Sequence, residues 1–209
     1  MKKSILTVLL VVSFLSVRAQ DDTVSTLRPS LCAPLSGTAL LATGTAFTFV
    51  PAMKNMAVEI RDAVQADGHG KITFDNYVQY LPAATPPLLN LCGLKSKNTF
   101  KKMALLEGGS FLLGALVLNA AKYGFSVQRP DLTRYNSFPS GHTFTAFTGA
   151  EVLRREYGEE YPWLAVAGYT VATLVGAMRI YNNRHWLGDV LAGAGLGILS
   201  VGATYWIAN

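Results

Sequence analysis

The amino-acid sequence predicts an all-α helical bundle. Strict alternation of apolar and polar residues, which marks half-buried strands, is scarce, whereas long runs rich in Ala, Leu, Gly and Val favour helices. No internal repeat, low-complexity tract or linker divides the 209 residues, so a single domain is expected. The expected helices span 36–53, 56–66, 73–93, 102–122, 142–157, 161–180 and 184–207.

Residues 1–20 have the layout of a secretory signal peptide. Lys2 and Lys3 precede an apolar run over 5–17, and the acidic pair Asp21-Asp22 follows. The run of about 13 apolar residues is short against the roughly 20 that span a bilayer, although an uncleaved anchor helix is the alternative. We therefore expect residues 21–209 to form one exported helical domain.

The charge balance gives no reason to expect a nucleic-acid partner. The formal net charge of the whole chain is +5. Loss of residues 1–20 would leave 15 basic against 13 acidic residues, which is close to neutral. No protein partner is predicted either.

Three of the apolar segments, 103–121, 161–178 and 190–208, are long enough to span a membrane, although Glu107 interrupts the first. A soluble periplasmic bundle is the alternative. Four cations without an intervening acid precede the first of these segments and should face the cytoplasm, namely Lys95, Lys97, Lys101 and Lys102.

That orientation places the segments 122–142 and 179–189 on the exported side. If the signal is cleaved, the mature N-terminus already lies outside the cytoplasm. The segment 36–53 then cannot cross the membrane if 73–93 also crosses it. We expect 36–53 to lie on, or dip into, the membrane surface.

Three cations in these exported segments suit the binding of a phosphoryl group. Phosphate oxygens need donors from several directions, which arginine forks and a lysine point charge supply. Lys122, Arg129 and Arg179 fit that need, and Pro130 fixes the backbone after Arg129. For any one of them alone, a solvated cation at a helix end would be the simpler interpretation.

Ser140 and Gly141 precede a predicted helix that begins at His142. The free backbone N–H groups at a helix start, together with the positive end of the helix dipole, favour an anion. A Ser-Gly pair on its own would be an ordinary helix cap.

The histidines can be assigned by their neighbours. A histidine nucleophile needs an acceptor that holds the proton on its other ring nitrogen. His185 has one in Asp189, four residues on and therefore on the same helix face, in an otherwise apolar run that gives a lone carboxylate little reason to be there. His142 has no such carboxylate nearby and suits protonation of the leaving oxygen.

Together these segments resemble the tripartite signature of the type 2 phosphatidic acid phosphatase and vanadium haloperoxidase superfamily, written KxxxxxxRP, PSGH and SRxxxxxHxxxD. The segments 122–130, 139–142 and 179–189 match with every spacing intact, except that Met178 replaces the usual serine. The resemblance implies a six-helix core, a phosphohistidine intermediate and no metal or other cofactor. It also implies that the missing serine would have donated a hydrogen bond to the phosphate.

The export signal and the flanking sequence are most similar to bacterial envelope members that act on lipid A, undecaprenyl pyrophosphate or phospholipid phosphates. Hydrolysis of such a lipid phosphate at the outer side of the inner membrane is therefore the predicted function. Arg134 and Arg184 add positive charge that suits a polyanionic headgroup or a diphosphate. The alternatives are a soluble nonspecific acid phosphatase, a vanadate-dependent haloperoxidase and a non-catalytic lipid-binding relative.

The segment from Asp67 to Phe74 resembles the middle of a calcium-binding loop. Its register would put Gln65 at the first ligand position and Asn76 at the twelfth, where the motif needs Asp and a bidentate Glu. A glycine-rich turn between helices is the preferred interpretation.

Overall fold

The computed structural model describes residues 29–208, and all the regular structure in that range is helical. The helices are α2 (Pro29–Phe49), α3 (Pro51–Gln65), α4 (Asp75–Val78), α5 (Leu81–Leu91), α6 (Phe100–Phe125), α7 (Gly141–Tyr157), α8 (Pro162–Tyr181) and α9 (Leu187–Ile207). The prediction of an all-α fold is confirmed, although these are eight helices and not six. The expected signal peptide, residues 1–20, lies outside the described part of the chain.

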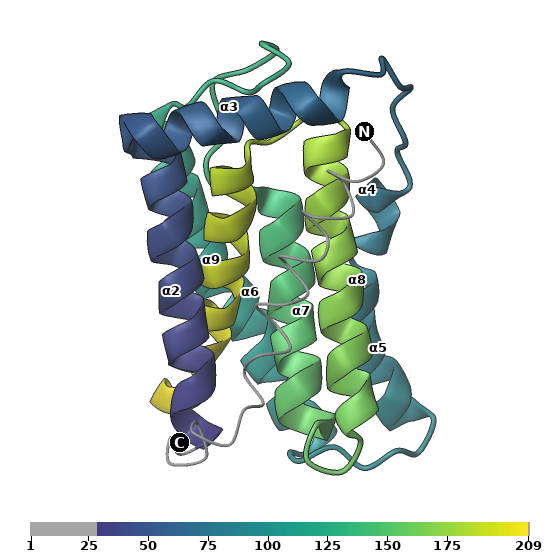
Figure 1. Ribbon diagram of the computed structural model, residues 1–209. Coiled ribbons are helices and arrows are strands. Elements are labelled where there is room, and N and C mark those ends of the chain that lie inside the picture. The colour runs from purple at the N-terminus through teal and green to yellow at the C-terminus, as the bar shows by residue number, and fades with distance from the viewer. Residues whose placement is uncertain (1–28, 209) are drawn as a thin grey trace.

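The long helices run side by side along one axis, and α9 lies among them (Figure 1). α9 packs against α2, α7 and α6, while α7 also packs against α8 and α5. Glycines allow α2 and α9 to approach closely, because a Cβ atom on Gly195 would lie only 2.5 Å from the backbone oxygen of Gly37. Small residues at helix contacts are typical of bundles in membranes.

The position of α2 corrects the expectation for residues 36–53. The helix is a full member of the bundle along α9, and the chain then turns by 89° into α3, which lies across one end of the bundle (Figure 1). Pro51 begins α3, where its missing N–H leaves no hydrogen bond unmade. The expectation was wrong because it came from counting spans, whereas Gly37 and Gly44 make α2 a close partner of α9.

The segment expected as one helix over 73–93 is divided into α4, a single turn, and α5, with 11 residues. Pro82 explains the division. A proline ring collides with the carbonyl group four residues earlier, which here belongs to Val78, the last residue of α4. The turn that results places α4 beside α8.

Within residues 29–208, three helices are long and apolar enough to cross a membrane: α6, α8 and α9. α2 and α3 pass the same test only as a bent pair. On α6, the side chains of Leu105, Leu112 and Leu116 are 68%, 66% and 63% exposed, as expected for a helix face in contact with lipid.

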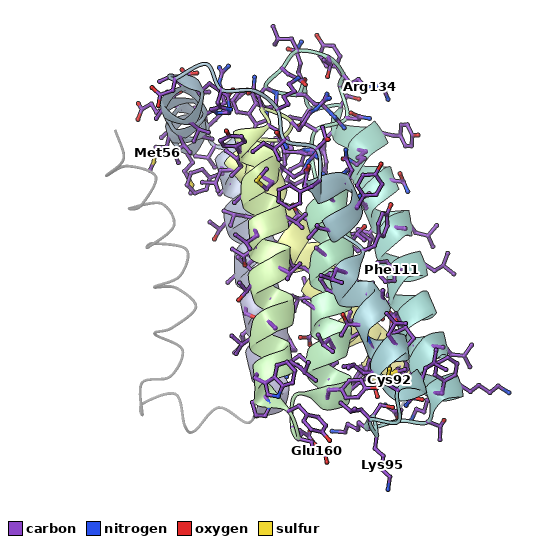
Figure 2. The ribbon with its side chains drawn as sticks, turned by 90° about the vertical axis from the view of Figure 1, so that its right-hand side faces the viewer. Met56, Cys92, Lys95, Phe111, Arg134 and Glu160 are labelled. Atoms are coloured by element: carbon purple, nitrogen blue, oxygen red, sulfur yellow. The ribbon has the colours of Figure 1, made fainter. Side chains whose placement is uncertain are left out.

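The two ends of the bundle differ in what they carry. Figure 2 shows Met56 and Arg134 at one end and Cys92, Lys95 and Glu160 at the other. The connections 66–74, 126–140 and 182–186 meet at the end that carries Arg134. The glycine-rich segment that resembles a calcium loop is an irregular connection between α3 and α4, as expected.

Candidate active site

Backbone and side-chain hydrogen bonds join the three motif segments at one end of the bundle. The backbone N–H of Ser140 donates to the backbone oxygen of Asp189 at 2.9 Å, which links the start of α7 to the start of α9. The indole N–H of Trp186 donates to the backbone oxygen of Gln128 at 2.8 Å. The segments 122–130, 139–142 and 179–189 therefore surround one place.

His185 and Asp189 form the expected pair, with Nδ1 of the imidazole 3.4 Å from Oδ2 of the carboxylate. His185 is 2% exposed and Asp189 is fully buried. The same Oδ2 accepts hydrogen bonds from the Ser137 hydroxyl at 2.5 Å and the Trp186 backbone N–H at 2.9 Å. These donors hold the carboxylate beside Nδ1, so Nε2 is the ring nitrogen left for chemistry.

His185 and Asp189 were expected to lie on the same face of one helix, and the structure places them differently. His185 precedes α9, which begins at Leu187, and Asp189 caps the first turn of that helix through the Trp186 backbone N–H. The four-residue spacing therefore brings the pair together across a helix start and not along one turn. At a helix N-terminus a carboxylate is stabilised by the helix dipole as well as by its donors.

Burial lowers the pKa of His185 to about 4, with a further lowering by the positive charges of Lys122 and Arg179, although Asp189 acts in the opposite direction. The imidazole is therefore neutral at pH 7. A neutral imidazole has the lone pair that a nucleophile needs.

Lys122 and Arg129 converge on one residue of the connection between α6 and α7. Nζ of Lys122 donates to the backbone oxygen of Asn136 at 2.8 Å, and Nε of Arg129 donates to its side-chain oxygen at 3.0 Å. Burial, and after it the positive charges of Arg179 and Arg184, hold the pKa of Arg129 below its usual range, although Asp131 opposes them. Cations crowded in this way attract an anion.

Arg179 is buried near the C-terminal end of α8, with 7% of its side chain exposed. Nη1 donates to Oδ2 of Asp75 at 2.5 Å, while Nε is buried without a hydrogen-bond partner among the described residues. A guanidinium with one edge fixed by a carboxylate and another N–H unused is suited to receive a phosphate oxygen.

Ser140 caps α7 through its side chain, as expected for a helix start. Its hydroxyl oxygen accepts from the backbone N–H and the hydroxyl of Thr143, at 3.4 Å and 2.9 Å. Because the Ser140 backbone N–H already bonds to Asp189, this N–H is engaged within the protein. The N–H groups of Gly141 and His142 lack intrahelical acceptors in the first turn, and they are the ones that an anion would meet.

His142 lies in the same turn, with Nε2 2.9 Å from the side-chain oxygen of Asn76. Burial, followed by the positive charge of Arg179, lowers the pKa of His142 to about 4. A bound phosphate would bring two negative charges to this place and favour the imidazolium form.

Asp75 and Asn76 contact Arg179 and His142, although neither was predicted as a site residue. A signal was present in the sequence, because Asp75 is a carboxylate in a segment with several apolar residues, as Asp189 is in its own apolar run. Asn136 and Ser137, between the first two motifs, were missed as well.

A cavity of about 430 Å³ opens beside Arg179 and Arg129. Its other charged lining residues are Lys71, Asp75, Arg134 and Arg184. Arg184 donates to Asp131 at 3.0 Å, so part of this positive charge is balanced within the protein.

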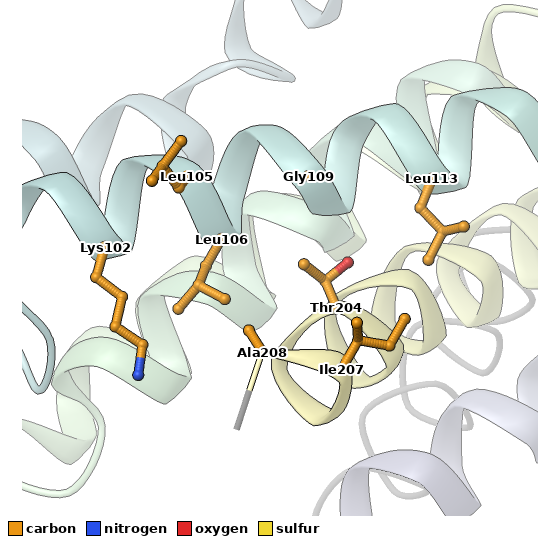
Figure 3. A pocket seen from close by; sticks show the side chains of 8 residues that line it. All are labelled: Lys102, Leu105, Leu106, Gly109, Leu113, Thr204, Ile207 and Ala208. Carbon is orange, nitrogen blue, oxygen red and sulfur yellow. The ribbon is translucent and has the colours of Figure 1, made fainter.

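A second cavity, of about 500 Å³, is mostly apolar and lies between α6 and α9 (Figure 3). Lys102, Leu106 and Ile207 are among its lining residues, so it is near the end of the bundle opposite the motifs. It has no place in the phosphate chemistry of the site.

Comparisons with known proteins agree with this geometry. The family model of the PAP2 superfamily matches residues 103–209, a range that includes every motif residue. A Lipid A 1-phosphatase of Porphyromonas gingivalis is 44% identical over 153 residues, which cover 72% of this chain and 34% of that protein. The chain therefore spans about a third of the length of this curated relative.

Two solved structures share the fold. The crystal structure of Aquifex aeolicus LpxE matches with a TM-score of 0.56 and 24% identity, over 71% of this chain and 94% of that one. A transmembrane PAP2 type phosphatidylglycerolphosphate phosphatase from Bacillus subtilis matches with a TM-score of 0.51 and 22% identity, over 84% and 96%.

The shared fold, together with three helices that are long and apolar enough to cross a membrane, agrees with a helical bundle embedded in a membrane. The matched region contains the three motifs and the helices that position them. The chain belongs to the PAP2 superfamily.

Proposed function

We propose that this protein is a phosphatase that hydrolyses a phosphate monoester or pyrophosphate of an envelope lipid through a phosphohistidine. The observation that carries the proposal is His185, held by Asp189 at 3.4 Å within a group of cations. The likeness to a Lipid A 1-phosphatase supports a lipid substrate.

In the first step, Nε2 of His185 attacks the phosphorus atom. A nitrogen–phosphorus bond forms and the bond to the leaving oxygen breaks, while His142 gives its proton to that oxygen. Lys122, Arg129 and Arg179, with the N–H groups of the first turn of α7, stabilise the charge on the phosphoryl oxygens.

In the second step, water attacks the phosphohistidine and gives a proton to His142. The nitrogen–phosphorus bond breaks, inorganic phosphate leaves and His185 regains its lone pair. Throughout the cycle Asp189 holds the proton on Nδ1, so the same ring nitrogen reacts each time.

The site is proposed to face the periplasm. Lys95 lies at the bundle end opposite Arg134 (Figure 2), and Lys97, Lys101 and Lys102 belong to the same connection or to the start of α6. Cationic connections stay in the cytoplasm, so the motif end would be exported.

The activity is tested by phosphate release in detergent from lipid A, undecaprenyl pyrophosphate, phosphatidic acid and p-nitrophenyl phosphate. Turnover of at least one lipid that is lost in His185→Ala is the expected result. Turnover of p-nitrophenyl phosphate alone would contradict the lipid substrate, and equal rates for the wild type and His185→Ala would contradict the mechanism.

Orientation is tested with single cysteines in a background without Cys32 and Cys92. An impermeant maleimide should label Arg134→Cys in intact spheroplasts and label Lys95→Cys only after lysis. The reverse pattern would show that the site faces the cytoplasm.

A further inference from the structure

The single turn α4 contacts two motif residues that lie on different helices. Asp75 contacts Arg179 of α8, and the next residue, Asn76, contacts His142 of α7. Both contacts join residues more than 60 positions apart, with separations of 104 and 66. Neither Asp75 nor Asn76 lies in the region 103–209 that the family model matches.

Asp75 is fully buried, so its charge requires compensation. Oδ2 accepts from Nη1 of Arg179 at 2.5 Å, and Oδ1 lies 3.4 Å from the side-chain nitrogen of Asn182. With this edge of the guanidinium fixed, the orientation of the unpartnered Nε is fixed too. Asp75 therefore determines where Arg179 presents its free N–H.

Asn76 acts on the imidazole of His142. Its side-chain oxygen lies 2.9 Å from Nε2, and a carboxamide oxygen can only accept a hydrogen bond. The contact therefore keeps a proton on Nε2 when the imidazole is neutral and restricts rotation of the ring. Nδ1 is then the nitrogen that takes up the second proton, and the imidazolium that results is the form that acts as a general acid towards a leaving oxygen.

The connection before α4 is docked on the end of α8. The Ile72 backbone N–H donates to the side-chain oxygen of Asn182 at 2.8 Å, and the side-chain nitrogen of Asn182 donates to the Ile72 oxygen at 2.6 Å. His69 stacks on Tyr181 with ring centroids 3.7 Å apart. These contacts hold α4 in place. Asp75 and Asn76 can orient other side chains only if α4 is itself fixed.

We propose that Asp75 and Asn76 are positioning residues of the active site, which orient Arg179 for the phosphate and His142 for the leaving group. The inference rests on the proposed phosphatase function. Two residues between α3 and α5, outside the three motif segments, would then belong to the active site.

The test for Asp75 compares Asp75→Ala with Asp75→Asn, because asparagine keeps an acceptor oxygen where alanine has none. Affinity for inorganic phosphate, measured by calorimetry on the purified full chain in detergent, should fall about tenfold or more in Asp75→Ala and be largely retained in Asp75→Asn. Asp67→Asn, which changes an exposed carboxylate in the same connection, is the matched control. This variant should bind phosphate as the wild type does.

The test for Asn76 uses the pH dependence of kcat. The charged or titratable groups that act on His142 are Arg179, Asp75, His185 and Arg129. Asn76→Asp adds a carboxylate that favours the imidazolium, so the alkaline limb of kcat should move up by about one pH unit or more. Asn76→Ala should lower kcat about tenfold without such a shift.

The outcomes separate this inference from the proposed function. A wild type that hydrolyses no lipid phosphate would refute the function, while the phosphate affinities still test whether Asp75 positions Arg179. If Asp75→Ala does not fold, Asp75→Asn and the two Asn76 variants decide. Equal phosphate affinity in Asp75→Ala and Asp67→Asn, or an unmoved alkaline limb in Asn76→Asp, would overturn the assignment for the residue concerned.

Discussion

Lys122 and Arg129 donate to the same residue, Asn136, one to its backbone oxygen at 2.8 Å and the other to its side-chain oxygen at 3.0 Å. One cation belongs to the end of α6 and the other to the connection that follows, seven residues later. Asn136 therefore sets the spacing between two of the charges that would surround a phosphate.

Asn136→Ala is expected to loosen this arrangement on one side only. The backbone acceptor for Lys122 remains, whereas Arg129 loses its partner, so KM should rise about tenfold while kcat changes less. Steady-state phosphate release over a range of substrate concentrations measures both constants. An unchanged KM would show that Arg129 is positioned by something other than Asn136.

His185→Ala is expected to remove the nucleophile and lower kcat by on the order of a thousandfold or more. The wild type, quenched during turnover of a ³²P-labelled substrate, should carry an acid-labile, alkali-stable label. The variant should carry none. A label of equal size in His185→Ala would assign the nucleophile elsewhere.

The pH profile follows from the two histidines. His185 acts as a neutral base, so kcat/KM should fall as the pH drops through about 4, where the ring becomes protonated. His142 has a pKa of about 4 without substrate, and the charge of a bound phosphate raises that pKa. The alkaline limb of kcat should therefore lie at higher pH than that of kcat/KM, and coincident limbs would contradict the role given to His142.

Met178→Ser restores the serine that the family pattern has before Arg179. If that hydroxyl donates to the phosphate, KM should fall about tenfold or more, because a hydrogen bond to a charged group contributes about 1.5–3 kcal/mol. The comparison with Met178→Ala separates the hydroxyl from the loss of side-chain volume. Equal KM values for the two variants would mean that position 178 does not contact the phosphate.

Gly195→Ala is expected to destabilise the bundle, because the added Cβ would lie 2.5 Å from the Gly37 oxygen. The cost should be about 1–3 kcal/mol, visible as a lower Tm in detergent. Gly108→Ala on α6 is the control, since its Cβ would meet nothing within 4 Å and alanine favours the helix. Equal Tm values for the two variants would contradict the close contact of α2 with α9.

The sequence could predict the helices and the meeting of the motifs, because both depend on local composition and short spacings. The pair His185–Asp189 was expected from its spacing, yet its setting at the start of α9 depends on Trp186 and Ser137, which the spacing does not contain. The division of 73–93 was readable in principle from Pro82.

The contacts of α4 with α7 and α8 could not be predicted from a single sequence. Asp75 and Arg179 are 104 residues apart, and no periodicity relates them. Their pairing depends on how the connection after α3 folds back onto α8, which is a property of the tertiary structure. The path of α2 was missed for the same reason, because its partner is the last helix of the described chain.

The close contact of α2 with α9, at Gly37 and Gly195, affects how such a protein should be handled after extraction from the membrane. The helix that carries the carboxylate beside His185 in its first turn is steadied along its length by α2. A detergent that separates the two would tilt that carboxylate away while leaving every helix intact. Turnover should then be lost before circular dichroism records any loss of helix. Activity is therefore a more sensitive test of native structure than helix content.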